Sequence, residues 1–189
     1  MRDFYKDLID SNNLSESKEI LDLYEKKFHS KIKNRIKITD RSSQKKGYDI
    51  ELHLEDGRIL TIEEKFRPDS KKFYPDLLVE IKHTNGDTRM GWLYKSNAEI
   101  LAYFQRKPDD SAFNLTLWKL KEISEWTKSN NFLSLLDLGY IKEIISHSNI
   151  NKNQWTTINY AIPFNILKKT NLNYKANKIN YLPLEFFKS

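Results

Sequence analysis

The chain has 189 residues, a net charge of +6 and a pI near 9.2, with 39% hydrophobic and 13% aromatic residues. This composition fits a globular domain rather than a disordered chain, and the positive charge favours a polyanionic partner. The chain has no cysteine and only four histidines. Disulfides and thiolate metal sites are therefore excluded, and any bound metal is expected to have oxygen ligands.

No stretch of the sequence has the length and apolar character of a membrane span, and the N-terminal segment MRDFYKDLID lacks the apolar core of a signal peptide. We therefore expect a cytoplasmic protein without membrane contact. No repeat and no flexible linker divides the chain. We expect one domain over residues 1–189, with its core at about residues 15–165 and an unassigned tail at about residues 171–189.

The first half of the chain predicts a helix followed by strands. The helix covers residues 15–29, where apolar residues recur at helical spacing after a serine that can cap the first turn: Ile20, Leu23, Tyr24 and Phe28. A short strand is predicted at residues 33–40, followed by a basic loop. Residues 48–67, YDIELHLEDGRILTIEEKFR, alternate apolar and polar side chains on both sides of Asp56-Gly57, which predicts a β-hairpin.

The second half predicts strands and helices in alternation. The predicted strands cover residues 76–83, 113–120 and 156–163, the last followed by a short helix. A helix is predicted at residues 96–105, because Ser96 and Glu99 have the spacing of a capping box. A second helical region is predicted at residues 121–147.

The hairpin turn determines which side chains face each other. A three-residue loop with Gly57 in the left-handed conformation pairs Leu54 with Arg58 and sets Asp49 opposite Glu63. Glu63 and Lys65 then share a polar face, whereas Glu64 points to the apolar face, because side chains alternate along a strand. A two-residue loop would set acids against the apolar layer, so we favour the first register.

The opposed acids suggest a bound cation. Like charges that face each other across a sheet are destabilising, and Lys65 offsets only part of this repulsion. Mg²⁺ prefers carboxylate and water oxygens and is often held by one or two carboxylates together with substrate phosphates. We therefore expect Asp49 and Glu63 to lie within reach of one cation, with Lys65 beside them.

These residues resemble the PD-(D/E)XK phosphodiesterase superfamily, which has a restriction-endonuclease-like fold. Asp49 is followed, after a hairpin, by Glu63-Glu64-Lys65, and RILTIEEKFR resembles the metal-binding strand of Holliday-junction resolvases. The resemblance covers about residues 15–82. It departs from the family pattern at Tyr48, where a proline is usual, and at Glu64, where an apolar residue is usual.

The resemblance implies an α/β fold, with a central mixed β-sheet flanked by helices in the order αβββαβ. It also implies an endonuclease-like hydrolase that cleaves DNA to leave a 5′-phosphate, with Mg²⁺ as cofactor and Mn²⁺ as a candidate substitute. Asp49 and Glu63 would bind the metal together with the Glu64 main-chain carbonyl, and Lys65 would assist the attacking water. Glu16, in the first helix, is implied as a further metal ligand.

Basic residues flank these positions in the sequence and are candidates for phosphate contacts: Arg41, Lys45 and Lys46 before Asp49, and Arg67, Lys71 and Lys72 after the triplet. The expected partner is double-stranded or branched DNA, and a homodimer is a candidate assembly.

Other interpretations stay open. Glu80-Ile81-Lys82 is a competing triplet after Pro75-Asp76, although its spacing is too short for a hairpin. The chain could also be a non-catalytic nucleic-acid-binding module on the same fold, its acids being structural, or a phage-type protein-interaction factor.

Overall fold

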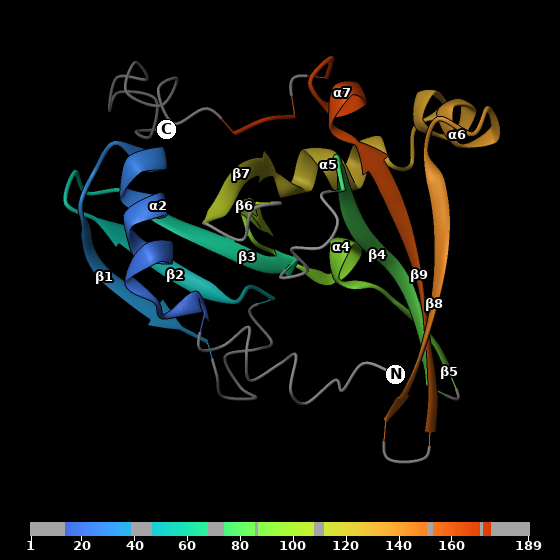
Figure 1. The fold of residues 1–189 in the computed structure, drawn as a ribbon, viewed down its shortest axis with the longest axis horizontal. Helices are drawn as coiled ribbons and strands as arrows, with labels where there is room; N and C mark the ends of the chain where they lie inside the picture. Colours follow the sequence, from blue (N-terminus) through green and yellow to red (C-terminus); the bar gives the residue numbers. More distant parts are fainter. Residues whose placement is uncertain are drawn as a thin grey trace, which may run out of the picture.

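The computed structural model describes residues 14–38, 47–67, 74–85, 87–107, 112–150, 153–170 and 172–174. These residues form a mixed α/β structure with two β-sheets (Figure 1). The helices are α2 (Lys18–Phe28), α4 (Trp92–Lys95), α5 (Leu120–Trp126), α6 (Asn130–Asp137) and α7 (Phe164–Leu167). The strands are β1 (Ile32–Lys37), β2 (Ile50–Leu54), β3 (Ile59–Arg67), β4 (Asp76–Asn85), β5 (Asp87–Met90), β6 (Ile100–Arg106), β7 (Phe113–Lys119), β8 (Lys142–Ile150) and β9 (Asn153–Pro163).

The first sheet has five strands in the order β1-β2-β3-β6-β7. It is mixed, because β3 and β6 run parallel while the other neighbours are antiparallel. The β2–β3 register confirms the predicted hairpin, with Ile50 opposite Ile62 and Leu52 opposite Leu60. Leu54 N donates to Arg58 O at 2.9 Å, and Gly57 has φ +89°, as the three-residue loop requires.

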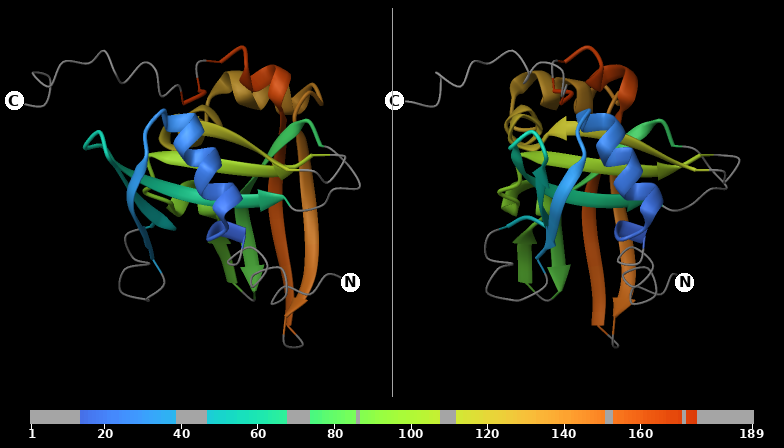
Figure 2. Two further views of the ribbon diagram at one scale, coloured as in Figure 1. Left: turned by 60° about the vertical axis from the view of Figure 1, so that its left-hand side comes forward. Right: turned by 90° about the vertical axis from the view of Figure 1, so that its left-hand side faces the viewer.

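The second sheet is antiparallel, with the strand order β5-β4-β9-β8. It lies beside the first sheet, with its strands running steeply across the direction of β3 (Figures 1 and 2). A bulge interrupts the β4–β9 ladder between Glu80 and Lys82. The strand predicted at residues 76–83 corresponds to β4. It belongs to the second sheet and not to the sheet that contains the hairpin.

Helix α2 covers one face of the five-stranded sheet (Figure 2). Its N-cap is Ser17, two residues after the predicted Ser15, and its side chain accepts from Ile20 N. Ile20, Tyr24 and Phe28 are buried against the apolar face of the hairpin. The alternation of the hairpin and the helical spacing of α2 thus build one core between them.

A second core lies on the opposite face of the sheet, over β6 and β7. Leu101, Tyr103 and Trp118 pack there against β4, β9 and the short helices. The polar face of β2 and β3 lies beside this core. The sheet therefore has an apolar side under α2 and a side that is apolar at β6–β7 and polar at β2–β3.

The helix predicted at residues 96–105 is wrong, because residues 100–106 form β6, an interior strand of the first sheet between β3 and β7. Both faces of this strand are covered, so consecutive residues are buried and ILAYF lacks the alternation of a half-exposed strand. Ser96 does not cap a helix there; its Oγ donates to Gly47 O at 2.8 Å. Among the described residues, the longest helix after the hairpin is α6, with eight residues.

The helix predicted at residues 121–147 is correct only in its first part. Helices α5 and α6 are present, but residues 142–150 form strand β8. Gly139, which has φ +75°, follows α6 and stops the helical backbone. The predicted strands at residues 33–40, 113–120 and 156–163 correspond to β1, β7 and β9, and the last is followed by α7 as expected. Within the described residues, no helix has the length and apolar character needed to cross a membrane.

Candidate active site

The candidate site lies where the β2–β3 ladder ends. Asp49 immediately precedes β2, and its Oδ2 accepts a hydrogen bond from Glu64 N at 2.8 Å, where the next bond between the strands would form. The main-chain N–H and C=O of a strand residue point to the same side, so the Glu64 carbonyl faces the same edge. The backbone of β3 thus fixes the Asp49 carboxylate beside a main-chain oxygen.

Lys65 connects the two acids of the predicted site. Its Nζ lies 2.5 Å from Glu63 Oε1 and 3.7 Å from Asp49 Oδ2. Asp49 is half-exposed, whereas the Glu63 side chain is only 8% exposed. The structure therefore brings together Asp49, Glu63 and Lys65, and the predicted sharing of one face by Glu63 and Lys65 is confirmed.

Burial and charge shift the protonation of this group. Burial raises the pKa of Glu63 above its usual value; the Lys65 ammonium opposes this shift and the Asp49 carboxylate adds to it. Burial would lower the pKa of Lys65, but the Glu63 and Asp49 carboxylates outweigh that effect and raise it. Lys65 therefore carries a proton at neutral pH and is the positive charge of the cluster.

Glu64 occupies a separate, buried network under α2. Its Oε1 accepts from Tyr24 Oη at 2.7 Å, and its Oε2 accepts from Arg35 Nη2 at 3.1 Å and from Ser15 Oγ. Burial, followed by the Glu64 charge, raises the pKa of Tyr24 well above its usual value, so the hydroxyl remains a donor. An acid at this position of β3 is compatible with the apolar core because its charge is paired and its oxygens accept hydrogen bonds.

No local pattern in the sequence predicts this network. Ser15, Tyr24 and Arg35 come from the segment before α2, from α2 itself and from β1, and they meet only when these pack together. The one available signal was Glu64 itself, since an acid on the apolar face of a strand requires buried partners.

Glu16 is not brought to this cluster. It lies just before α2, is 65% exposed and forms an ion pair with Lys37 Nζ at 3.3 Å. Lys37 is two residues along β1 from Arg35, so this pair lies on the α2 side of the sheet, while Glu63 and Lys65 face the other side. The expectation that Glu16 joins Asp49 and Glu63 does not agree with this placement.

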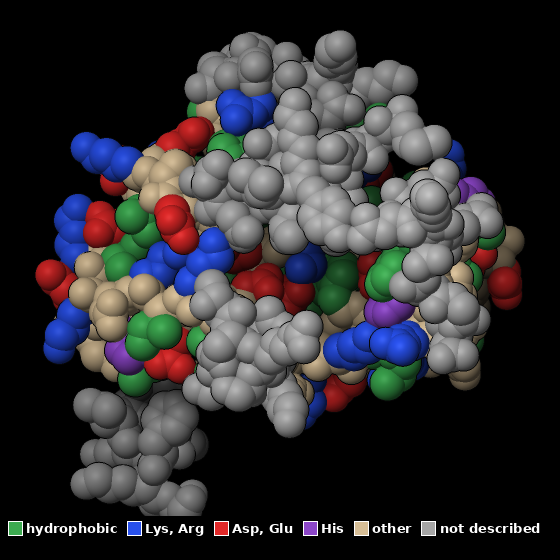
Figure 3. Space-filling model, turned by 90° about the horizontal axis from the view of Figure 1, so that it is seen from below, with side chains coloured by type: hydrophobic (Ala, Val, Ile, Leu, Met, Phe, Trp, Pro, Cys, Tyr) green, Lys and Arg blue, Asp and Glu red, His purple; other side chains and the backbone are tan. Residues whose placement is uncertain are grey.

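The polar face continues beyond the acids. His53 Nε2 lies 2.6 Å from Glu51 Oε1, and Tyr48 Oη donates to Glu51 Oε2 at 3.2 Å. Viewed from below, the molecule has acidic and basic side chains close together near the middle of the view (Figure 3). The surface offers both charges and hydrogen-bonding groups to a ligand.

Of the basic residues predicted to contact DNA, the structure describes Arg67. Its Nη1 pairs with Asp76 Oδ1 at 2.5 Å, and its guanidinium lies 4.0 Å from the centre of the Tyr74 ring. Arg67 is thus engaged in joining β3 to β4. The other predicted contacts lie outside the described residues: Arg41, Lys45, Lys46, Lys71 and Lys72.

The competing triplet lies on β4, in the second sheet. Asp76 pairs with Arg67, Glu80 Oε1 lies 3.1 Å from His83 Nδ1, and Lys82 is exposed. Neither acid has an ion pair with Lys82 among the described contacts. This strand does not reproduce the arrangement around Lys65.

The donor atoms fit Mg²⁺ in part. No group of three or more His, Cys, Asp or Glu side chains able to hold a metal occurs in the described part of the chain. Asp49, Glu63 and the Glu64 carbonyl supply oxygen donors, and Mg²⁺ commonly takes only one or two carboxylates and completes its shell with water and substrate phosphate. The set suits a weakly held, substrate-assisted ion.

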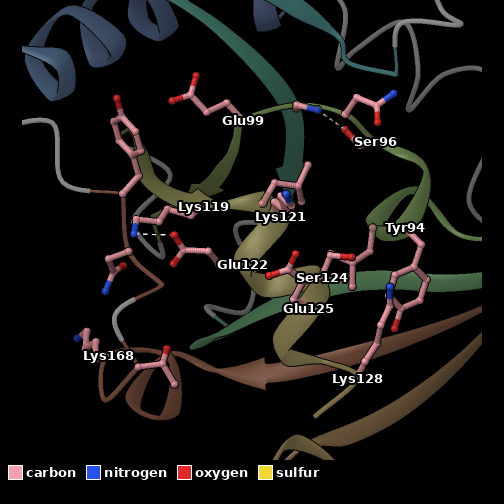
Figure 4. A pocket seen from close by; sticks show the side chains of 17 residues that line it. Tyr94, Ser96, Glu99, Lys119, Lys121, Glu122, Ser124, Glu125, Lys128 and Lys168 are labelled. Carbon is pink, nitrogen blue, oxygen red and sulfur yellow. Dashed lines mark hydrogen bonds and ion pairs between the residues drawn. The ribbon is translucent and has the colours of Figure 1, made fainter. Parts of the chain in front are cut away.

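A pocket of about 950 Å³ is lined by residues of α4, of the segment that follows it and of α5, together with Lys168, Thr170, Asn173 and Tyr174 (Figure 4). Its lining includes both lysines and glutamates, and Lys119 Nζ lies 2.7 Å from Glu122 Oε1. Asp49, Glu63 and Lys65 are not among its lining residues. The acid cluster is therefore not part of the wall of this pocket.

Comparisons of the chain with protein-family models, with curated proteins and with solved structures gave no match.

Proposed function

We propose that this chain is a Mg²⁺-dependent nuclease that hydrolyses DNA phosphodiester bonds on a restriction-endonuclease-like core. The observation that carries the proposal is the contact of Lys65 with both Asp49 and Glu63 at the open end of the β2–β3 hairpin. Two acids and a lysine on one surface, beside a main-chain oxygen, form the set that metal-dependent phosphodiester hydrolysis needs.

The topology supports the same proposal. The order α2, β1, β2, β3 followed by β6 parallel to β3 agrees with the αβββαβ order that the resemblance implies, up to the crossover. Here β4, β5 and α4 occupy the crossover in place of a long helix. The proposed core is therefore a variant in which two strands of the second sheet, β4 and β5, are inserted after β3, while β8 and β9 follow β7.

The proposed roles follow from the positions of the side chains. Asp49, Glu63 and the Glu64 carbonyl would hold the ion, which when bound would polarise the phosphoryl group and lower the pKa of a water ligand. Lys65 would donate a hydrogen bond to the attacking water or to a phosphate oxygen as negative charge develops. Asp49 would remain in place because Glu64 N anchors its carboxylate.

The test is incubation with supercoiled, linear, single-stranded and branched DNA in the presence of Mg²⁺, Mn²⁺ or EDTA. We expect cleavage with the metals and none with EDTA. Lys65→Ala should lower kcat by about 10²-fold to 10³-fold and leave DNA association intact, because its contact forms in the transition state. Lys82→Ala is the matched control on β4 and should cleave DNA with the kcat of the wild type.

A non-catalytic DNA-binding module is the second candidate. It is favoured by two observations: within the described residues no three His, Cys, Asp or Glu side chains are grouped so that they could hold a metal, and the direct Lys65–Glu63 ion pair neutralises one acid without a metal. DNA binding that persists in EDTA, with no nicking of any substrate, would replace the nuclease proposal by this one. Loss of cleavage in Lys82→Ala but not in Lys65→Ala would move the site to β4.

A further inference from the structure

The Lys65 ammonium has an aromatic neighbour as well as two acids. Its Nζ lies 5.0 Å from the centre of the Trp92 ring. A cation within about 6 Å of a tryptophan ring centre is attracted by the negative face of the ring. Trp92 is half-buried and is the first residue of α4, which belongs neither to the hairpin nor to the five-stranded sheet.

The backbone of β4 fixes the position of Trp92. The preceding residue, Gly91, donates from its N to Ile81 O at 2.9 Å. A Cβ atom at Gly91 would lie 2.4 Å from Glu80 O and 2.8 Å from Ile81 C, so only glycine fits against the bulge of β4. Ser96 N donates to Trp92 O at 2.9 Å and closes the single turn. The second sheet thus fixes the backbone that carries Trp92.

We propose that Trp92 is a positioning residue: its ring holds the Lys65 ammonium group in front of Asp49 and Glu63. The role in catalysis rests on the proposed function. A lysine side chain is flexible, and without the ring its charged end would leave the small region between the two acids for part of the time. The ring attracts the cation without adding a charge, so it leaves the carboxylate oxygens available to another ligand.

The first test compares Trp92→Leu, Trp92→Phe and the control Trp126→Leu by kcat and KM for the cleaved DNA. Trp126 packs edge-on against Phe132 in the second core, 5.0 Å between ring centres, so its loss reports the general cost of removing a tryptophan. We expect Trp92→Leu to lower kcat between about 2-fold and about 30-fold with KM unchanged, the range for an ordinary cation–π contact. Trp92→Phe should recover part of kcat, and Trp126→Leu should not lower it.

The second test does not depend on cleavage. Acetylation of Lys65 by an amine-reactive ester at one fixed pH is followed by mass spectrometry, with Lys95 and Lys121 as internal references. Trp92→Leu should speed the labelling of Lys65 relative to these lysines, and Trp92→Phe should do so less. Unchanged labelling of Lys65 in Trp92→Leu would overturn the proposal, as would a rise in KM alone, which would make Trp92 a substrate contact. If the wild type cuts nothing while the labelling changes as expected, the nuclease proposal fails and the positioning contact stands.

Discussion

Glu63 and Glu64 are neighbours in sequence with different surroundings. Glu63 shares the Lys65 ammonium with Asp49, while Glu64 accepts from Tyr24, Arg35 and Ser15 under α2. The Glu64 carboxylate therefore stabilises the packing of α2 on the sheet, and its N–H orients Asp49. One residue thus links the helix to the candidate site through its backbone.

Glu64→Gln should destabilise the fold strongly. The Arg35 and Glu64 side chains are 11% and 5% exposed, and removal of one charge from a buried pair leaves the other uncompensated. We expect the free energy of unfolding in urea to fall by about 3 to 5 kcal/mol.

Glu16→Gln is the matched control for that experiment. Glu16 is 65% exposed in its pair with Lys37, so its substitution should cost less than about 1 kcal/mol. It should also leave metal binding unchanged, whereas a loss of Mg²⁺ affinity would restore Glu16 as a ligand. Equal destabilisation by the two substitutions would contradict the buried network.

Metal binding should depend on pH through Glu63. Burial, reinforced by the Asp49 charge and opposed by Lys65, holds the pKa of Glu63 above 4.5, so Glu63 takes up a proton at a higher pH than an ordinary glutamate does. Only the ionised form binds a cation, so Mg²⁺ affinity measured by calorimetry should decrease as the pH is lowered, and the decrease should begin at a higher pH than for an ordinary glutamate. Glu63→Gln should remove most of this dependence; a wild-type affinity that does not change with pH would exclude Glu63 as the ligand.

At the scale of elements, the candidate site is formed by the β2–β3 hairpin of the first sheet and by α4, a single helical turn that packs against β4 of the second sheet. The β2–β3 hairpin supplies the acids and Lys65, while α4 places Trp92 over the lysine. Gly91 is the point at which α4 meets β4, and it is required for space, since its φ of −71° is available to any residue. The contact between α4 and β4 therefore depends on the absence of a side chain at Gly91.

Gly91→Ala should loosen that contact. The added Cβ would overlap backbone atoms of Glu80 and Ile81, which cannot move aside as a flexible side chain could. We expect a loss of about 1 to 3 kcal/mol in the free energy of unfolding. Gly139→Asn is the control, because Gly139 has open space around it and asparagine tolerates its positive φ. A smaller effect at Gly91 than at Gly139 would show that α4 is not held by this close approach.

For the whole molecule, the net charge of +6 is the largest argument for a polyanionic partner. The acids of the candidate site are negative, so under the proposed function DNA would have to be attracted by basic residues around them. Lys45 and Lys46 precede Asp49 closely in the sequence. They are candidates for phosphate contacts in the proposed function.

DNA affinity should fall steeply with salt, because each phosphate contact releases condensed counterions. Fluorescence anisotropy titrations at several salt concentrations measure the slope of log Kd against log salt. The double substitution Lys45→Ala, Lys46→Ala should reduce this slope by about 2. Lys121→Ala with Lys142→Ala makes the same change in net charge on α5 and β8 and should leave the slope nearly unchanged. A flat salt dependence of the wild type would argue against a nucleic-acid partner.

The sequence by itself determined the local features of this protein. Alternation and the Asp56-Gly57 turn set the register that places Asp49 at the same end of the hairpin as Glu63, with Lys65 on the face of Glu63. Helical spacing likewise predicted α2. These features depend on residues close in sequence, whose backbone geometry and side-chain period are fixed before any distant contact forms.

Only the tertiary structure decided what depends on distant partners. Residues 100–106 became a strand because β3 and β7 pair with them on both edges while both faces are covered, and this gives an apolar run without strand periodicity. β4 joined β9 instead of the hairpin sheet, and that choice brought Trp92 to Lys65. The partners of Glu64 likewise come from three separate segments. Such contacts arise from packing between elements far apart in the chain, which the pattern of any one segment does not encode.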